Sequence, residues 1–145
     1  MVLTTTGAAK AVGNALPELK GILTASAIRV PTPNVSLAIM LLNLKTAVNV
    51  KDLNHFLRNL SLESKQIDYS ASTEVASSDF VGNRCSGIVD SKSTTVQGNR
   101  INLYVWYDNE FGYSCQVVRV LQQISGIIHP KFPAEEDATH IVDDE

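Results

Sequence analysis

This chain of 145 residues has few of the side chains that build metal centres and disulfide frameworks. It contains three histidines and two cysteines, Cys85 and Cys115, and none of them has the spacing of a metal site or a catalytic triad. Two thiols are too few for a disulfide framework, so we expect a reducing, cytoplasmic compartment. Arg84 precedes Cys85, and such a neighbouring guanidinium can modestly lower the pKa of a thiol.

Long apolar runs and basic clusters are also lacking. No segment is apolar over the length of a bilayer, and no basic residue precedes Lys10, so we expect neither a membrane span nor a signal peptide. The net charge is only −3, without the basic footprint of a nucleic-acid-binding protein. We therefore expect a soluble globular domain that binds neither nucleic acid nor membrane.

The acidic residues gather at the C-terminus. Residues 131–145 contain six acids and one lysine, so the preceding 130 residues carry a small positive excess. Such a charge run with few large apolar residues is typical of a solvated extension. We predict a folded domain over residues 1–130 and an acidic, disordered tail over residues 131–145.

Hydrophobic periodicity predicts three helices and six strands. The first helix begins near Ala8 and is ended by Pro17, with a threonine available as N-cap. The second covers residues 50–62, and Asn49 with Asp52 three residues later resembles a capping box at its start. The third is marked by Val117, Leu121, Ile124 and Ile128. The predicted strands are residues 25–30, 35–44, 66–69, 87–90, 94–97 and 100–107.

The order of these elements predicts the fold class. Most strands follow one another through turns, as at Gly98-Asn99, and the helices are separate. We therefore expect an α+β fold in which helices cover a mixed, largely antiparallel sheet. Strand 35–44 is apolar on both faces, which predicts cover on both sides by helices, by another subunit or by one of each.

Two features of the N-terminal part are candidate anion sites. Thr6-Gly7 stands at a helix start, where free N–H groups and the dipole favour a phosphate, although most such starts are simple caps. Arg29 interrupts an otherwise apolar strand, so its guanidinium needs a partner. A structural salt bridge and a bound oxyanion both satisfy that need, and the sequence leaves both open.

The segment 106–114 joins the strongest predicted strand to the closing helix. It places an amide (Asn109), a carboxylate (Glu110) and aromatic rings such as Tyr113 at one corner, which is typical of a ligand site on a rigid scaffold. The alternative is that Asp108 or Asn109 caps the helix and Glu110 complements its dipole, and the sequence alone favours that role.

Three long blocks resemble a known family. Residues 6–12 (TGAAKAV), 29–36 (RVPTPNVS) and 106–114 (WYDNEFGYS) are similar, in this order, to the C-terminal half of phosphorylating glyceraldehyde-3-phosphate dehydrogenase. The resemblance covers about residues 4 to 128. It implies an oxidoreductase that forms a thiohemiacetal on a cysteine, passes hydride to NAD or NADP, and releases the acyl group to inorganic phosphate.

The resemblance also implies roles for single residues. Thr6 and Gly7 match residues that bind the attacking phosphate, and Arg29 matches an arginine that holds the phosphate of the sugar substrate. Asn109 matches the asparagine that hydrogen-bonds the nicotinamide carboxamide, and Tyr113 matches a tyrosine packed by that ring. Tyr107 matches a tyrosine that borders the active site in that family. A homo-oligomer, tetrameric in full-length members, is implied as well.

The departures from the family are large. The 145 residues contain no Gly-x-Gly-x-x-Gly fingerprint, no Ser-Cys-Thr-Thr-Asn motif with its nucleophile, and no activating histidine after it. We therefore assign no catalytic residue and expect a truncated dehydrogenase catalytic domain that is inactive alone. The uncovered apolar surface and strand edge of such a domain predict self-association.

Two rival functions remain. Erythrose-4-phosphate dehydrogenase, a sister family, usually has Trp-Cys-Asp-Asn-Glu-Trp-Gly at the corner, whereas this chain has Tyr107 and Phe111, so we favour the triose enzyme. The other rival is a non-catalytic interaction fragment of the same fold. The determinants of NAD or NADP preference lie in the family's cofactor-binding half, outside the resemblance.

Overall fold

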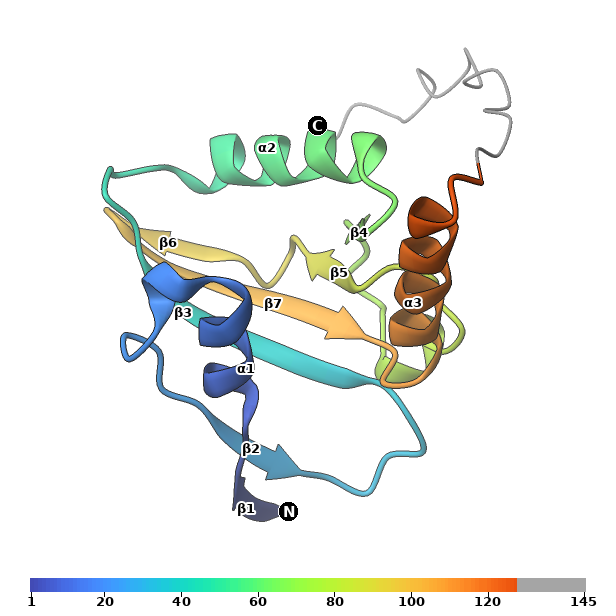
Figure 1. Ribbon diagram of the computed structural model, residues 1–145. Coiled ribbons are helices and arrows are strands. Elements are labelled where there is room, and N and C mark those ends of the chain that lie inside the picture. The colour runs from blue at the N-terminus through green and yellow to red at the C-terminus, as the bar shows by residue number, and fades with distance from the viewer. Residues whose placement is uncertain (128–145) are drawn as a thin grey trace. The chain divides into compact units, whose positions relative to one another are not determined.

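The computed structural model describes residues 1–127 and divides into two compact units, Met1–Asn34 and a second unit that begins at Val35 (Figure 1). The predicted tail over residues 131–145 and the domain boundary at residue 130 lie outside the described residues. No helix within residues 1–127 is long and apolar enough to cross a membrane.

The first unit is a two-stranded antiparallel sheet with a short helix in its connection. Strand β1 (Val2–Thr5) pairs with β2 (Ser26–Arg29), and α1 (Ala8–Ala15) and the 3₁₀ turn η1 (Pro17–Leu19) lie between them in the chain. Pro17 ends α1 as predicted, because a proline lacks the N–H that continues a helix. Strand β1 was not among the strands predicted from the sequence.

The second unit contains a mixed five-stranded sheet. The strands lie in the order β3-β7-β5-β4, and β6 pairs with β7 beside this path. The β4–β5 pair is parallel and the other pairs are antiparallel, which confirms the predicted largely antiparallel sheet. The strands are β3 (Ser36–Asn43), β4 (Ile67–Ser70), β5 (Gly87–Asp90), β6 (Thr95–Gln97) and β7 (Arg100–Tyr107).

Two helices accompany this sheet, as the α+β prediction requires. Helix α2 (Val50–Glu63) packs beside β4, and α3 (Phe111–Ile124) begins where β7 ends (Figure 1). A 3₁₀ turn, η2 (Ser77–Phe80), lies between β4 and β5 in the chain. Asn49 caps α2 as predicted, because its Oδ1 accepts the N–H of Asp52 at 2.9 Å.

The core of the second unit is small and lies on the central strands. Ile88 and Val89 on β5 and Ile101 and Leu103 on β7 are buried, with Ile88 only 1% exposed. Around Ile88 lie Val35 and Phe80, and the Phe80 ring stacks on Trp106 with 5.5 Å between the ring centres. This stack fastens the η2 segment to the end of β7 that leads into the 106–114 corner.

Helix α3 presents a polar face to the unit and an apolar face outward. Gln116 Nε2 donates to the Arg84 carbonyl at 3.0 Å, and Arg119 Nη2 donates to the Lys65 carbonyl. The apolar positions at helical spacing are exposed instead, up to 77% at Ile124. The outer face of β3 is similarly uncovered within the described residues, where Leu41 is 74% exposed. The exposed apolar side chains on α3 and β3 include Val117, Val120, Leu121, Ile124, Leu37, Ile39 and Leu41.

The Asn49 cap yields a stability prediction. Asn49→Ala leaves the first-turn N–H of Asp52 without its acceptor, and we expect a loss of about 1 kcal/mol in the free energy of unfolding, measured by urea denaturation. Asn59→Ala is the matched control, because Asn59 is an exposed asparagine of the same helix that bonds only the His55 ring. Equal losses in the two variants would contradict the capping role.

Candidate functional site

The buried carboxylate of Asp108 organises the corner between β7 and α3. Its Oδ1 accepts the N–H groups of Glu110 at 2.8 Å and Phe111 at 2.7 Å, and its Oδ2 accepts the N–H of Gly82 at 2.9 Å. The first two bonds cap the start of α3 in the way that side-chain oxygens cap helices. Of the two predicted capping residues, Asp108 therefore has this role and Asn109 does not.

Asn109 is exposed at this corner, and its amide does not cap α3. Its Oδ1 accepts a hydrogen bond of 2.9 Å from the hydroxyl of Ser36, the first residue of β3. The two residues are 73 positions apart in the chain, so the antiparallel pairing of β3 with β7 brings them together. The amide is thus accessible to a ligand and held from one side.

Tyr113 lies in the first turn of α3 and is 72% exposed. Gly112, its neighbour, explains how closely the helix approaches the loop behind it: a Cβ at this position would lie 2.6 Å from the carbonyl oxygen of Cys85. Only glycine permits that approach. Tyr107, at the end of β7, is half-buried and pairs with Ser36 across the ladder. The second unit therefore brings Tyr107, Asn109 and Tyr113 to one corner.

The first unit holds the remaining predicted site residues. Thr6 Oγ1 accepts the N–H of Ala8 at 3.3 Å, so the threonine supports the start of α1, while Gly7 occupies the N-cap position. A Cβ on Gly7 would meet no atom within 4 Å, which leaves its surface open. Both readings of Thr6-Gly7, cap and anion site, are compatible with this geometry.

Arg29 is exposed at the last position of β2, opposite Val2. Among residues 1–127 no carboxylate forms an ion pair with the Arg29 guanidinium, so the salt-bridge alternative finds no support in the described part of the chain. Thr5 pairs with Ser26 at the opposite end of the ladder. Arg29 is therefore three strand residues, roughly 10 Å, from Ser26 and its partner Thr5. Thr5 directly precedes Thr6-Gly7 in the chain.

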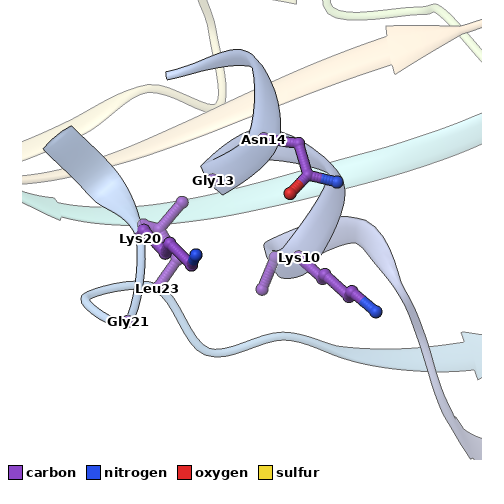
Figure 2. Close-up of a pocket in the computed structure, with 7 residues that line it drawn as sticks. Lys10, Gly13, Asn14, Lys20, Gly21 and Leu23 are labelled. Carbon is purple, nitrogen blue, oxygen red and sulfur yellow. The ribbon is translucent and has the colours of Figure 1, made fainter. Parts of the chain in front are cut away.

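A hollow of about 300 Å³ lies in the first unit, away from these residues. Figure 2 shows Lys10 and Asn14 projecting from α1, with Lys20 on the turn that follows. Gly13 lets this turn approach the helix, because a Cβ there would lie 3.2 Å from the Cα of Lys20. None of Thr6, Gly7 and Arg29 lines the hollow.

The surroundings of Cys85 favour the protonated thiol. Partial burial raises the pKa of the Cys85 thiol, the nearby Asp68 carboxylate raises it further, and the Arg119 guanidinium opposes both. The expectation of a lowered pKa is therefore wrong, because desolvation and the Asp68 carboxylate outweigh the positive charge, which Arg119 of α3 contributes. Among the described residues no group of three His, Cys, Asp or Glu could hold a metal ion.

Residues 1–109 match the model of the glyceraldehyde 3-phosphate dehydrogenase C-terminal domain. The chain belongs to this family. The match ends at Asn109, but similarity to relatives continues through most of the chain, which includes the turn with Tyr113.

Three relatives show the extent of the similarity. A glyceraldehyde-3-phosphate dehydrogenase-like protein of Pseudomonas aeruginosa (strain UCBPP-PA14) is 57% identical over 92% of this chain and 30% of its own length. Glyceraldehyde-3-phosphate dehydrogenase 2 of Staphylococcus aureus (strain N315) is 42% identical over 90% of this chain and 38% of its own. The Priestia megaterium glyceraldehyde-3-phosphate dehydrogenase is 44% identical over 86% and 38%. The chain thus spans about a third of the length of these relatives.

Sequence analysis missed one residue of this dehydrogenase-family corner. Ser36 appeared only as the last letter of the block at residues 29–36, and its spacing from Asn109 carries no signal. The contact depends on the strand register Ser36↔Tyr107, which is a tertiary property. Predicting the register in which strand 35–44 pairs with strand 100–107 would have placed Ser36 close to Asn109.

The Asp108 carboxylate gives a second prediction. Asp108→Ala leaves the N–H groups of Gly82, Glu110 and Phe111 without the carboxylate oxygens that accept them, and we expect a loss of about 2–4 kcal/mol in the free energy of unfolding. Asp108→Asn retains one side-chain oxygen and should lose less. Chemical denaturation of both variants measures the difference. If Asp108→Ala lost less free energy of unfolding than Asp108→Asn, the result would contradict this role.

The raised pKa of Cys85 gives a third prediction. In Cys115→Ser, which leaves Cys85 as the only thiol, alkylation by iodoacetamide at neutral pH should be slower than that of free cysteine, because less thiolate is present. The stabilising contribution of the protonated thiol is fully present below the ordinary thiol pKa. It is lost as the pH rises through the higher folded pKa. Alkylation as fast as that of free cysteine would show that Cys85 has no raised pKa.

Proposed function

We propose that this chain is the catalytic-domain part of a phosphorylating glyceraldehyde-3-phosphate dehydrogenase. In this proposal the whole enzyme converts glyceraldehyde 3-phosphate, inorganic phosphate and NAD or NADP to 1,3-bisphosphoglycerate. The observation that carries the proposal is the state of Asn109. Asp108 takes over the capping of α3, so the Asn109 amide is exposed beside Tyr113 and available to a ligand. Membership of the dehydrogenase family gives this site its chemistry.

In the proposed function, Asn109 and Tyr113 bind the nicotinamide end of the cofactor. The amide of Asn109 hydrogen-bonds the carboxamide, and the exposed ring of Tyr113 packs beside the nicotinamide. The bound cofactor supplies the hydride acceptor for aldehyde oxidation. The contribution of this chain is to hold the ring in one orientation, which aligns it for transfer.

Thr6, Gly7 and Arg29 bind the two phosphates in this proposal. Thr6 and Gly7 offer inorganic phosphate the open start of α1, where N–H groups point outward. Arg29 grips the phosphate of the sugar substrate through its planar fork, and its exposure without a carboxylate partner in the described residues fits that role. Their separation along the β1–β2 ladder suits two different phosphate groups.

The nucleophilic thiol, its base and the cofactor domain come from polypeptide outside these 145 residues in this proposal. The chain spans 30–38% of the relatives that it matches, and it has no Ser-Cys-Thr-Thr-Asn motif. We propose that it is inactive alone and works as part of a cytoplasmic homo-oligomer. The exposed apolar residues of α3 and β3 support this, because such surfaces mark interaction sites.

A chimera tests the function. The 145-residue chain replaces the corresponding segment of the Priestia megaterium relative, and we expect glyceraldehyde 3-phosphate and phosphate to drive NAD or NADP reduction. Arg29→Ala should raise the KM for glyceraldehyde 3-phosphate at least about tenfold, because a charge-assisted contact is lost. Steady-state kinetics measure both effects.

Arg100→Ala is the matched control, since Arg100 is another exposed strand arginine, and it bonds Gln97 rather than a proposed ligand. Erythrose 4-phosphate, assayed in parallel, separates the sister activity from the proposed one. A folded chimera without activity, or one in which both arginine variants behave alike, would overturn the proposal. Cofactor reduction by the 145-residue chain alone would refute its inactivity.

A further inference from the structure

The face of helix α3 that packs on its own unit carries a cysteine. Gly112 is buried and Cys115, Gln116 and Arg119 are half-buried, whereas residues 113, 114, 117 and 118 are exposed. Spacings of three and four residues place side chains on one side of a helix. Cys115 therefore lies on the side of α3 that meets the rest of the unit.

Cys85 belongs to the loop that this side of α3 meets. A Cβ at Gly112 would lie 2.6 Å from the Cys85 carbonyl oxygen, so the backbone of Cys85 lies against the start of the helix. The Cys85 Sγ lies 3.8 Å from the carbonyl oxygen of Lys65. The same oxygen accepts a hydrogen bond from the Arg119 guanidinium, two turns further along α3. Cys85 thus lies beside α3 between the levels of Gly112 and Arg119.

Cys115 is placed between these two levels. It follows Gly112 by three residues, about 4.5 Å along the helix axis, and precedes Arg119 by four. The electrostatics agree with this placement. Burial is the largest cause of the raised pKa of the Cys85 thiol, and the nearby Cys115 group raises that pKa as well. The two thiols, thirty positions apart in the chain, therefore lie close together in the folded unit.

Both thiols are free in the structure, and both are half-buried, so a small reagent has access to them. We propose that Cys85 and Cys115 form a redox-modification site, at which a low-molecular-weight disulfide oxidises the two thiols to one intrachain disulfide bond. The bond joins the loop before β5 to helix α3. This inference does not rest on the proposed function, because neither cysteine belongs to the proposed ligand site.

The reaction is two successive thiol–disulfide exchanges. The thiolate of one cysteine attacks a sulfur of the small disulfide, which forms a mixed disulfide and expels one small thiolate. The thiolate of the other cysteine then attacks the protein sulfur of the mixed disulfide and expels the second small thiolate. The two protein thiols lose two hydrogens and two electrons, and the small disulfide is reduced to two thiols.

The surroundings of Cys85 also bear on the reverse reaction. A thiol with a raised pKa is a poor leaving group, so the attack that expels Cys85 from the bond is slowed. In a reducing compartment disulfides are transient and respond to oxidants, so this pair is a modification site and not a structural framework.

Mass spectrometry of the 145-residue chain is the first test. Wild type, treated with oxidised glutathione in native buffer, should lose two hydrogens and retain no glutathione, and peptide mapping should find Cys85 linked to Cys115. Cys85→Ser and Cys115→Ser should each retain one glutathione, because the thiol that resolves the mixed disulfide is absent. Wild type that retains glutathione on both thiols, or forms only links between two chains, would overturn the proposal.

The second test asks whether the native fold brings the thiols together. In glutathione redox buffers, the ratio of oxidised to reduced chain gives the effective concentration of the thiol pair. We expect this concentration to be at least about tenfold higher in native buffer than in urea, where only flexible chain joins the two cysteines. Equal values in the two solvents would show that the fold contributes nothing, and the proposal would be wrong.

The third test measures the effect of the bond on stability. The oxidised chain should unfold at a temperature roughly 5 °C or more above that of the reduced chain, because the bond restricts the unfolded state. Dithiothreitol should reverse the shift, and Cys115→Ser given the same treatment should show none, with circular dichroism as the measurement. An oxidised wild-type chain that melts below the reduced chain would show that the bond distorts the fold, which contradicts adjacent native thiols.

Discussion

The buried carboxylate of Asp108 is the constraint on which the corner of this molecule depends. It accepts three backbone N–H groups, two from the start of α3 and one from the loop at Gly82. A buried carboxylate is stable only when hydrogen bonds replace its hydration, so its position and that of the three donors are set together. The end of β7, the start of α3 and the loop before β5 are therefore held at one point. The predicted site residues of the second unit, Tyr107, Asn109 and Tyr113, are within five residues of Asp108 in the chain.

Helix α3, which begins at this corner, turns its polar face toward the unit and its apolar face outward. Helix α3 approaches the unit through Gly112 and is bonded by Gln116 and Arg119 to two backbone carbonyls. Its large apolar residues are consequently left outward, on the same helix that carries Tyr113. In an ordinary single domain such a stripe would face the core. Here the polar anchoring leaves the stripe exposed among the described residues.

Much of the fold was predictable from local pattern. The cap at Asn49, the stop at Pro17 and the turn at Gly98 follow from properties of single residues, and the structure confirms all three. The strand at 100–107 was found because its β-forming residues extend over eight positions. Strand β1 was not predicted. The role of the α3 stripe was not predictable, because periodicity shows which residues share a face and not what that face meets.

The sequence by itself determined the family, the element order and the candidate residues Thr6, Gly7, Arg29, Asn109 and Tyr113, because these depend on residue type and local spacing. Only the tertiary structure decided that Asp108 rather than Asn109 caps α3, and that Ser36 holds the Asn109 amide. The physical reason is that both decisions depend on hydrogen bonds whose partners meet through the folded loop and strand register. In the sequence, the neighbouring carboxylate of Asp108 and amide of Asn109 are both suitable capping groups. In the structure, the buried carboxylate accepts the N–H groups at the start of α3.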